Sequence, residues 1–300
     1  MILKKNMSDL SPICLFAFNR PNETKMCLNH LSKCKLAKKS ELFIFIDGPR
    51  SELDSNLCNQ TLINCKTFTK KFKKLQIVFS TKNKGLASSV ISGINDVFNK
   101  YDKIIVLEDD LLVSNNFLLY HNQCLKKYKN FIDVFSISGY NFNLKAMNET
   151  SSDVCFLRRS CSWGWSTWSD RWYEIDWSDD SFQKNINNKE NKVKIRKGGN
   201  DLLRMSKNQI KGKINSWSIK FSVHQLLKEK LTVYPKVSKL INIGFNSKAT
   251  HTKSSRRFKT TLDVSEKDIF LLSNTTLLIT KIEKEFNNKF SLLNIILDKF

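Results

Sequence analysis

The strongest constraint on the fold of this chain is a regular alternation, through its first 138 residues, of short apolar runs and longer amphipathic stretches. The apolar runs cover residues 12–18, 42–47, 75–80 and 103–108. The stretches between them, near 23–34, 52–72 and 86–99, repeat apolar residues at helical spacing. Near-continuous apolar strands that alternate with helices predict a parallel sheet covered on both faces. We therefore expect an α/β fold with a Rossmann-type, mostly parallel sheet flanked by helices.

Polar residues follow three of these four runs directly. They are Asn19-Arg20-Pro21, Asp47-Gly48-Pro49 and Glu108-Asp109-Asp110. In open α/β sheets, ligands bind beyond the carboxyl ends of the strands. The sequence therefore predicts a site at this edge of the sheet, with an arginine and several carboxylates.

An aromatic block follows at residues 162–173 and contains four of the six tryptophans. Trp165, Trp168 and Trp172 stand at i, i+3 and i+7 and would form a core stripe on one helix. Trp163, Trp165 and Trp168 would equally form a platform that stacks on the C–H faces of a sugar. Both interpretations stay open at this point.

The rest of the second half is more polar. The stretch 179–200 is rich in Asn and Lys and predicts a loop or mobile flap, followed by helices near 201–211 and 217–229 and a strand at 231–234. Residues 268–300 are amphipathic and predict a helical tail, which packs on the core or rests on an anionic membrane. We expect a domain over 1–255 and an amphipathic helical extension over 256–300.

The net charge of +22 suggests a polyanionic partner. However, 41 of the 50 cations are lysines, which recognise phosphates and bases less specifically than arginine. We therefore expect a lysine-coated surface and no nucleic-acid partner, while an anionic membrane or a phosphorylated substrate stays compatible with this charge.

The predicted location is cytoplasmic, with peripheral attachment to the inner face of the cell membrane still open. No apolar run approaches the roughly 20 residues that span a bilayer, and the first nine residues are too polar for a secretory signal. The eight cysteines include no CxxC pair, so we expect reduced structural thiols.

The acidic triplet Glu108-Asp109-Asp110 is the sharpest chemical signal. Three adjacent acids at the end of a buried strand repel one another unless a cation compensates. Hard divalent cations such as Mn²⁺ and Mg²⁺ prefer carboxylate and phosphate oxygens. The alternative, acids that favour the start of a helix, fits poorly because Leu111-Leu112-Val113 intervenes. We predict a Mn²⁺ or Mg²⁺ site.

This segment, Leu107-Glu108-Asp109-Asp110-Leu111, resembles the acidic motif of the Golgi N-acetylglucosaminyltransferase I family and its bacterial relatives. Those proteins are inverting glycosyltransferases of the GT-A fold, and the resemblance covers about residues 11–252. It implies that Asp110 ligates the metal on the donor diphosphate. It also implies that Glu108 and Asp109 contact the donor sugar and ribose.

Four other segments extend the resemblance. The first, 16–21, implies that Arg20 contacts the nucleotide, and Ile46-Asp47-Gly48 implies that Asp47 recognises the uracil. Ser89 stands where the family has a nucleotide-contacting histidine, and His251 matches a downstream histidine near the diphosphate. The segment 159–165 is similar to the one that leads to the acceptor pocket, which implies acceptor contacts for Trp163 and Trp165.

The catalytic base is the main departure from the family pattern. The family carries Asp-Asp-Trp, whose first Asp is the base, and the counterpart here is Asn215-Ser216-Trp217. An amide cannot accept the proton of the acceptor hydroxyl at neutral pH. Asp201, one predicted helix earlier, is a substitute, as is Asp176.

The resemblance implies a metal-dependent glycosyltransferase that moves a sugar from a UDP-linked donor to a glycan or glycolipid acceptor. The implied setting is bacterial surface polysaccharide synthesis, such as lipopolysaccharide. One alternative is a basic nucleic-acid-binding protein, which the acidic strand ends oppose. Another is a nucleotidyltransferase of related topology, which usually carries a glycine-rich loop where this chain has Asn19-Arg20-Pro21-Asn22.

Overall fold

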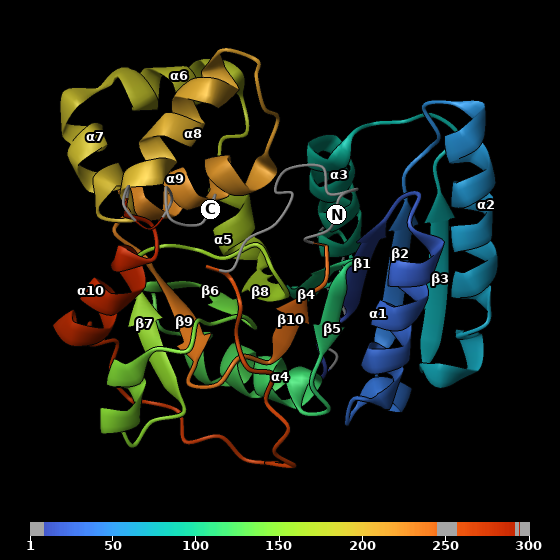
Figure 1. Cartoon of the computed structure of the whole chain (residues 1–300), viewed down its shortest axis with the longest axis horizontal. Helices are drawn as coiled ribbons and strands as arrows, with labels where there is room; N and C mark the ends of the chain where they lie inside the picture. The colour runs from blue at the N-terminus through green and yellow to red at the C-terminus, as the bar shows by residue number, and fades with distance from the viewer. Residues whose placement is uncertain (1–8, 245–256, 292–293, 295–300) are drawn as a thin grey trace, which may run out of the picture.

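The computed structural model describes residues 9–244, 257–291 and 294. An eight-stranded sheet forms its centre (Figure 1). In order across the sheet, its strands are β3 (Lys74–Phe79), β2 (Glu41–Ile46), β1 (Ile13–Ala17), β4 (Lys103–Glu108), β8 (Trp165–Trp168), β6 (Val134–Ser138), β9 (Leu231–Pro235) and β7 (Val154–Leu157). The first four are parallel, β8 runs antiparallel between β4 and β6, and β7 is an antiparallel edge. The predicted α/β fold with a mostly parallel sheet is confirmed.

The predicted helices of the first half are present as α1 (Pro21–Lys33), α2 (Glu52–Lys66) and α3 (Leu86–Phe98), and α4 (Phe117–Tyr128) follows. α2 ends earlier than expected because the hydroxyls of Thr67 and Thr69 donate to carbonyls of its last turn. Among the described residues, no helix is long and apolar enough to cross a membrane.

The central sheet is buried on both faces except at the edge strand β3, whose side chains alternate between exposed and half-buried. Successive side chains of a strand point to opposite faces. In β1, Ile13 and Leu15 join the core cluster that includes α1 and α4, whereas Cys14 and Phe16 join the cluster beneath α3. This two-sided burial explains why the strands are apolar without alternation.

The aromatic block forms a strand and a short helix, so the core interpretation of Trp165, Trp168 and Trp172 is right, but the single helix that it assumed is wrong. β8 is followed by α5 (Ser169–Tyr173). In a strand, residues three apart face opposite ways, and Trp165 and Trp168 accordingly lie in the clusters on opposite faces of the sheet. Both side chains are 1% exposed, and Trp172 is fully buried.

The polar stretch 179–200 is helical, and the predicted loop is wrong. It forms α6 (Asp179–Asn187) and α7 (Lys189–Arg196), which Ser178 and Asn188 cap at their N-termini. Its few apolar residues, such as Phe182 and Ile195, are buried in a separate small core. The predicted helices that follow are confirmed as α8 (Asn200–Ile210) and α9 (Trp217–Leu227). We call α6–α9 the helical cap, which stands at one end of the molecule (Figure 1).

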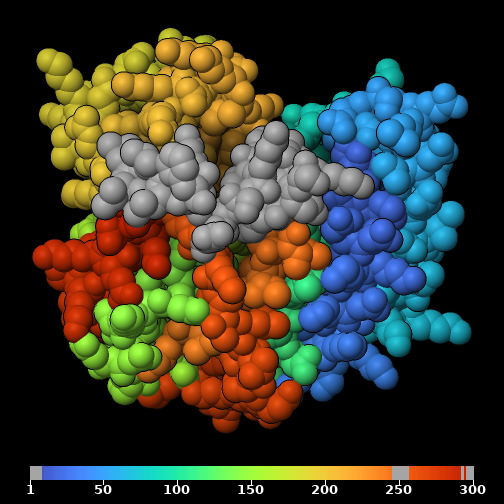
Figure 2. All heavy atoms as spheres, viewed as in Figure 1, coloured from blue at the N-terminus to red at the C-terminus, as the bar shows by residue number. Residues whose placement is uncertain are grey.

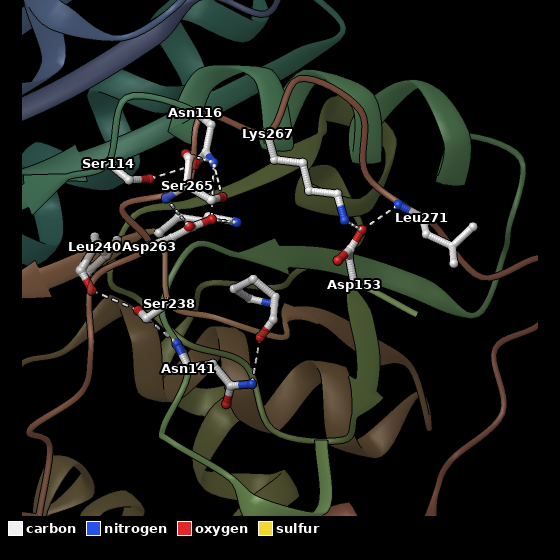
Figure 3. Close-up of polar contacts among 12 residues, drawn as sticks. Ser114, Asn116, Asn141, Asp153, Ser238, Leu240, Asp263, Ser265, Lys267 and Leu271 are labelled. Atoms are coloured by element: carbon white, nitrogen blue, oxygen red, sulfur yellow. Dashed lines mark hydrogen bonds and ion pairs between the residues drawn. The ribbon is translucent and has the colours of Figure 1, made fainter. Parts of the chain in front are cut away.

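Residues 257–279 form an extended strap over the body of the protein, visible in orange and red in Figure 2. The tail contains one helix in its described part, α10 (Thr280–Asn288). Figure 3 shows the polar contacts that fix the strap: Asn116 donates to Asp263 and Ser265, and Asp153 accepts from Lys267 and from the N–H of Leu271. The apolar side chains that complete this attachment, Phe270, Ile282, Phe286 and Phe290, belong to the core cluster of the sheet.

A buried ion pair between Lys239 and Asp263 lies at the centre of this attachment. The side chains are 5% and 8% exposed, and the Lys239 ammonium also lies 4.5 Å from the centroid of the Phe270 ring. Burial lowers the pKa of Lys239, against the opposing effect of Asp263. Burial alone would raise the pKa of Asp263, but hydrogen bonds from Lys239 and Ser265 lower it. Each charge therefore depends on the other.

We predict that Asp263→Ala lowers the free energy of unfolding by about 3–5 kcal/mol, because it leaves the Lys239 charge buried without a partner. Lys267→Ala is the matched control, because it breaks an exposed pair on the same strap and should cost less than about 1 kcal/mol. Urea unfolding followed by circular dichroism measures both. Equal losses would show that the buried pair does not secure the strap.

Candidate functional site

The acidic triplet lies at the carboxyl end of β4, as predicted. Glu108 ends the strand, and Asp109 and Asp110 form a turn into β5 (Leu111–Val113), which pairs with β10 (Leu240–Asn242). Glu108 is half-buried, and Asp109 and Asp110 are only 6% and 9% exposed. The pairing of β5 with β10 therefore fixes the turn that carries the acids. Asp109 and Asp110 are largely removed from water.

Arg20 is the cation that faces these acids. Its Nη1 lies 2.9 Å from Asp110 Oδ2 and 3.5 Å from Asp109 Oδ1, and the N–H of Phe18 donates to Asp109 Oδ2 at 3.4 Å. β1 and β4 are parallel neighbours, so the loop after β1 reaches the turn after β4. The structure thus brings together Arg20, Asp109 and Asp110, as the sequence predicted.

One guanidinium does not balance three carboxylates. Burial, with the charges of the neighbouring acids, raises the pKa of Glu108 to about 8 and that of Asp109 to about 7. Burial raises the pKa of Asp110 as well, against the opposing effect of Arg20. The turn therefore holds excess negative charge that a further cation would stabilise.

The donor set fits a hard divalent cation. Only carboxylate oxygens are offered, the ligands that Mn²⁺ and Mg²⁺ take together with substrate phosphates. In the described ranges, no three His, Cys, Asp or Glu side chains are arranged to hold a metal by themselves.

Gly244 is a site residue that sequence reasoning missed. A Cβ at this position would lie 2.1 Å from Asp110 Oδ2, and the preceding Ile243 N–H donates to the Asp110 carbonyl at 2.9 Å. A larger residue fits here only if the Asp110 carboxylate moves. The sequence signal for this site residue was a glycine two residues after a short strand. Residues 245–256 follow, so the predicted donor residue His251 lies outside the described residues.

Asp47 organises a neighbouring loop. Its Oδ1 accepts from the N–H groups of Gly48 and Lys84, both at 2.9 Å, and its Oδ2 accepts from Gly85 N–H at 2.9 Å and Asn83 Nδ2 at 3.1 Å. A carboxylate offers about four lone-pair sites, and all four are engaged. In this structure a uracil N–H would have to displace one of these donors.

The same loop approaches the end of β2 closely. A Cβ on Gly48 would lie 2.3 Å from the carbonyl carbon of Lys82, which explains the Asp-Gly pair. The loop leads into α3, where Ser89 sits half-buried in the first turn. Asp47 and Gly48 thus set the position at which α3 begins.

A second support, also missed from sequence, holds the loop that carries Arg20. Asp54 on α2 accepts from Arg50 Nε at 2.8 Å and from Asn19 Nδ2 at 2.5 Å. The hydrogen bond from Arg50 lowers the pKa of Asp54. The Arg50 guanidinium also lies 4.8 Å from the centroid of the Phe18 ring. The loop after β1 is therefore held at Asn19 by Asp54 and at Phe18 by the Arg50 guanidinium.

A cavity of about 190 Å³ lies between the sheet, the helical cap and α10. Its walls are mainly apolar and include Tyr140, Phe142, Trp163, Leu202, Met205, Ile219, Phe258 and Phe286. Cys161 also lines it, and burial raises the pKa of this thiol to about 11. Gly164, next to the lining residue Trp163, lies against Leu240 of β10, the strand that pairs with β5.

The structure separates the two tryptophans predicted to bind an acceptor. Trp163 lines the cavity and meets the Tyr140 ring edge-on, with centroids 4.9 Å apart. Trp165 is in the core, stacked on Trp217 at 5.0 Å and on Trp172 at 6.0 Å. Trp165 thus presents almost no surface to a ligand, because β8 turns it away from the cavity.

The two candidate bases differ in their surroundings. Both Asp201 oxygens accept from Arg159, at 2.6 and 3.0 Å, and this pair is almost fully buried on the cavity wall. Asn215 is exposed in the loop before α9, whose Ser218 lines the cavity. Asp176, the second substitute, is exposed. Asp201 is therefore held in an ion pair with Arg159. Asn215 precedes the cavity residue Ser218 by three positions in the sequence.

No family model and no curated protein match this chain. Among solved structures, residues 1–349 of TarS from S. aureus are similar at a TM-score of 0.48 and 10% identity, over 78% of this chain and 61% of that one. The mannosyltransferase PcManGT from Pyrobaculum calidifontis, in complex with GDP-Man and Mn²⁺, is similar at 0.44 and 8% identity, over 75% and 71%. The chain spans 22% of a longer TarS chain, at a TM-score of 0.34 and 13% identity. These similarities are remote.

Stability should depend on pH through the acidic turn. Because the folded state raises the pKa of Glu108 and Asp109, it binds protons more tightly than the unfolded chain between about pH 5 and 8. The free energy of unfolding should therefore fall as pH rises through this window. Glu108→Gln should reduce that fall by about 1–3 kcal/mol.

Urea unfolding at the two ends of this window, with a chelator present, measures the effect. The control is Glu52→Gln, an exposed acid in the first turn of α2. The same pH dependence of the free energy of unfolding in both variants would contradict the inference that ionisation of the buried acids in the turn destabilises the fold.

Gly244→Ala should displace the Asp110 carboxylate and weaken Mn²⁺-dependent nucleotide binding by about tenfold or more, since one lost charge-assisted contact is worth about 1.5–3 kcal/mol. Isothermal titration calorimetry with UDP and Mn²⁺ measures the change. Unaltered binding by a folded variant would show that the close contact at Asp110 is not needed.

Proposed function

We propose that this chain is a metal-dependent glycosyltransferase that takes a sugar from a nucleoside-diphosphate donor. The observation that carries the proposal is the excess of desolvated carboxylates beside Arg20, at the carboxyl ends of parallel strands. A nucleoside diphosphate with its divalent cation supplies both the positive charge and the phosphate oxygens that this turn lacks. The motif resemblance supports the same activity.

Each donor residue has a role in this proposal. Asp110, with Asp109 beside it, would hold Mn²⁺ or Mg²⁺, which when bound stabilises negative charge on the departing diphosphate. Arg20 lies where its guanidinium can also donate to a phosphate oxygen. Glu108 faces the donor sugar. Ser89 and His251 remain proposed donor contacts, and the donor nucleotide is proposed to be UDP.

The cavity is the proposed acceptor site. Trp163 and Tyr140 present aromatic surface for a sugar ring, and Ser218 and Ser222 supply hydroxyls on the opposite wall. We propose a glycan or glycolipid acceptor in bacterial surface polysaccharide synthesis, with transfer that inverts the anomeric centre. In this proposal the acceptor extends from the cavity toward the donor sugar at Glu108.

Asp201 is a positioning residue in this proposal, because Arg159 engages both of its oxygens. Asn215 then occupies the position of the catalytic base, and its amide cannot accept the proton of the acceptor hydroxyl. Orientation and charge stabilisation by the remaining site would still support transfer at a reduced rate.

The donor assignment predicts that Asp110→Ala abolishes Mn²⁺-dependent UDP binding, so that any remaining affinity is at least tenfold weaker. The free energy of unfolding should be unchanged or higher, because repulsion in the turn is relieved. Calorimetry with and without Mn²⁺ measures binding, and Asp180→Ala, at an exposed acid of α6, is the control. Product analysis of the native chain against a panel of nucleotide sugars tests the activity itself. Unchanged binding in the Asp110 variant would refute the metal assignment.

The base assignment predicts that Asn215→Asp raises turnover by about 10²-fold, within the usual contribution of general-base catalysis. The carboxylate would accept the acceptor proton where the amide cannot. Asp201→Asn should instead lower stability, because it breaks a buried bidentate pair. Steady-state rates across pH distinguish the two. A fall in activity for Asn215→Asp, together with complete loss in a stable Asp201→Asn variant, would place the base at Asp201.

A further inference from the structure

The helical cap concentrates positive charge. Residues 184–213 contain ten lysines and arginines and only two acids, Glu190 and Asp201. Asp201 is buried against Arg159, so it does not offset the surface charge. Most of the ten cations are exposed. Over residues 179–227 the whole cap has eleven lysines and arginines and four acids, because Asp179 and Asp180 of α6 add to the two above, and its net charge is +7 of the +22 of the chain.

The cations form a row on each of two helices. On α7, Lys189, Lys192 and Arg196 stand at i, i+3 and i+7, on the same face as Val193, which is 58% exposed. On α8, Arg204, Lys207 and Lys211 repeat this spacing and are all exposed. In the part of the chain that the structure describes, none of these six cations forms an ion pair with a carboxylate.

The buried sides of these helices leave the cation rows at the surface, with Lys192 half-buried. Ile195 of α7 and Leu202 and Leu203 of α8 are buried in the small core of the cap. The cation rows are thus the outer faces of amphipathic helices that pack inward. Figure 2 shows the cap as a lobe at one end of the molecule.

We propose that the outer face of α7 and α8 docks on an anionic bilayer surface. Two open rows of separate, mostly lysine charges complement an extended layer of lipid phosphates, and each cation near such a leaflet strengthens binding by about fivefold. The exposed Val193 fits the boundary between headgroups and acyl chains. This surface lies on the cap, not on the tail, for which the sequence left a membrane contact open as one of two alternatives.

The composition of the cap opposes nucleic acid as the partner. Single-stranded nucleic acids bind basic surfaces that also carry aromatic side chains for stacking. The aromatic residues of the cap, Phe182, Trp217 and Phe221, are all buried. The cap offers charge without a stacking surface.

Docking through this face would also orient the proposed acceptor site. Leu202 and Met205 line the cavity from the side of α8 opposite to Arg204 and Lys207. A helix is about 10 Å across, so one helical layer would separate the cavity from the headgroups. That separation suits a glycan that extends from a lipid. Only this consequence rests on the proposed function; the docking itself does not.

Vesicle co-sedimentation of the full chain tests the proposal without measuring activity. The probes are phosphatidylcholine vesicles and vesicles in which about one third of the lipid is phosphatidylglycerol. We expect binding to the anionic vesicles alone, weakened by added salt. The triple variant Lys189→Gln, Lys192→Gln, Arg196→Gln should bind about 100-fold more weakly.

The matched control is Lys66→Gln, Lys70→Gln, Lys71→Gln, which removes the same charge from exposed positions at the C-terminal end of α2 and just after it, at the other end of the molecule (Figure 1). It should bind within about threefold of the native chain, since distant charges are screened. Circular dichroism and thermal melting test whether both variants fold; the changed side chains are exposed except that of Lys192, which is half-buried.

Three results would overturn the proposal. Equal losses in the two triple variants would assign binding to net charge. Equal binding to phosphatidylcholine alone would remove the role of the cations. Equally tight binding to soluble heparin or single-stranded RNA, lost in the α7 variant, would make the cap a general polyanion surface. A failed nucleotide-sugar assay affects none of these measurements, so the two proposals fail separately.

Discussion

The structure is organised around three carboxylates that the fold takes out of water and that one guanidinium only partly balances. Arg20 reaches Asp109 and Asp110 because β1 and β4 are parallel neighbours. Asp54 and Arg50 hold the loop that carries this arginine, and Gly244 leaves room for the Asp110 carboxylate. These supports come from separate parts of the chain and converge on one turn. Their common effect is to keep the acids close together despite repulsion.

The second buried charge cluster has a different balance. Lys239 and Asp263 form a pair of one cation and one anion, with Asn116 and Ser265 satisfying the remaining oxygens. Such a pair is complete without a ligand, and its role is to attach the strap. The acidic turn, by contrast, has more negative charge than its one arginine can balance. The contrast between the two clusters distinguishes a structural use of buried charge from a site that gains stability when a ligand binds.

Local patterns predicted the parts of the fold whose signal is local. The apolar runs predicted β1, β2, β3 and β4. The positions of Arg20 and the acidic triplet followed because both stand directly after the carboxyl end of a predicted strand. Trp165 and Trp168 were ambiguous because a spacing of three fits one helix face and also opposite faces of a strand. The cap helices α6 and α7 were missed because few apolar residues are needed to bury one side of a short helix. The partners of Asp47 and Asp201 come from distant segments, Lys84 and Arg159, so no local pattern revealed them.

The strap has a consequence for how the chain folds during synthesis. Lys239 and the strands around it leave the ribosome before Asp263 and the strap that completes their surroundings. Until then the nascent domain holds an ammonium group in a site that its final partner has not reached, and that site stays open to water. Domains generally fold from the N-terminus as they emerge. The arrival of the strap therefore gives Lys239 its partner, and α10 follows it to complete the apolar core.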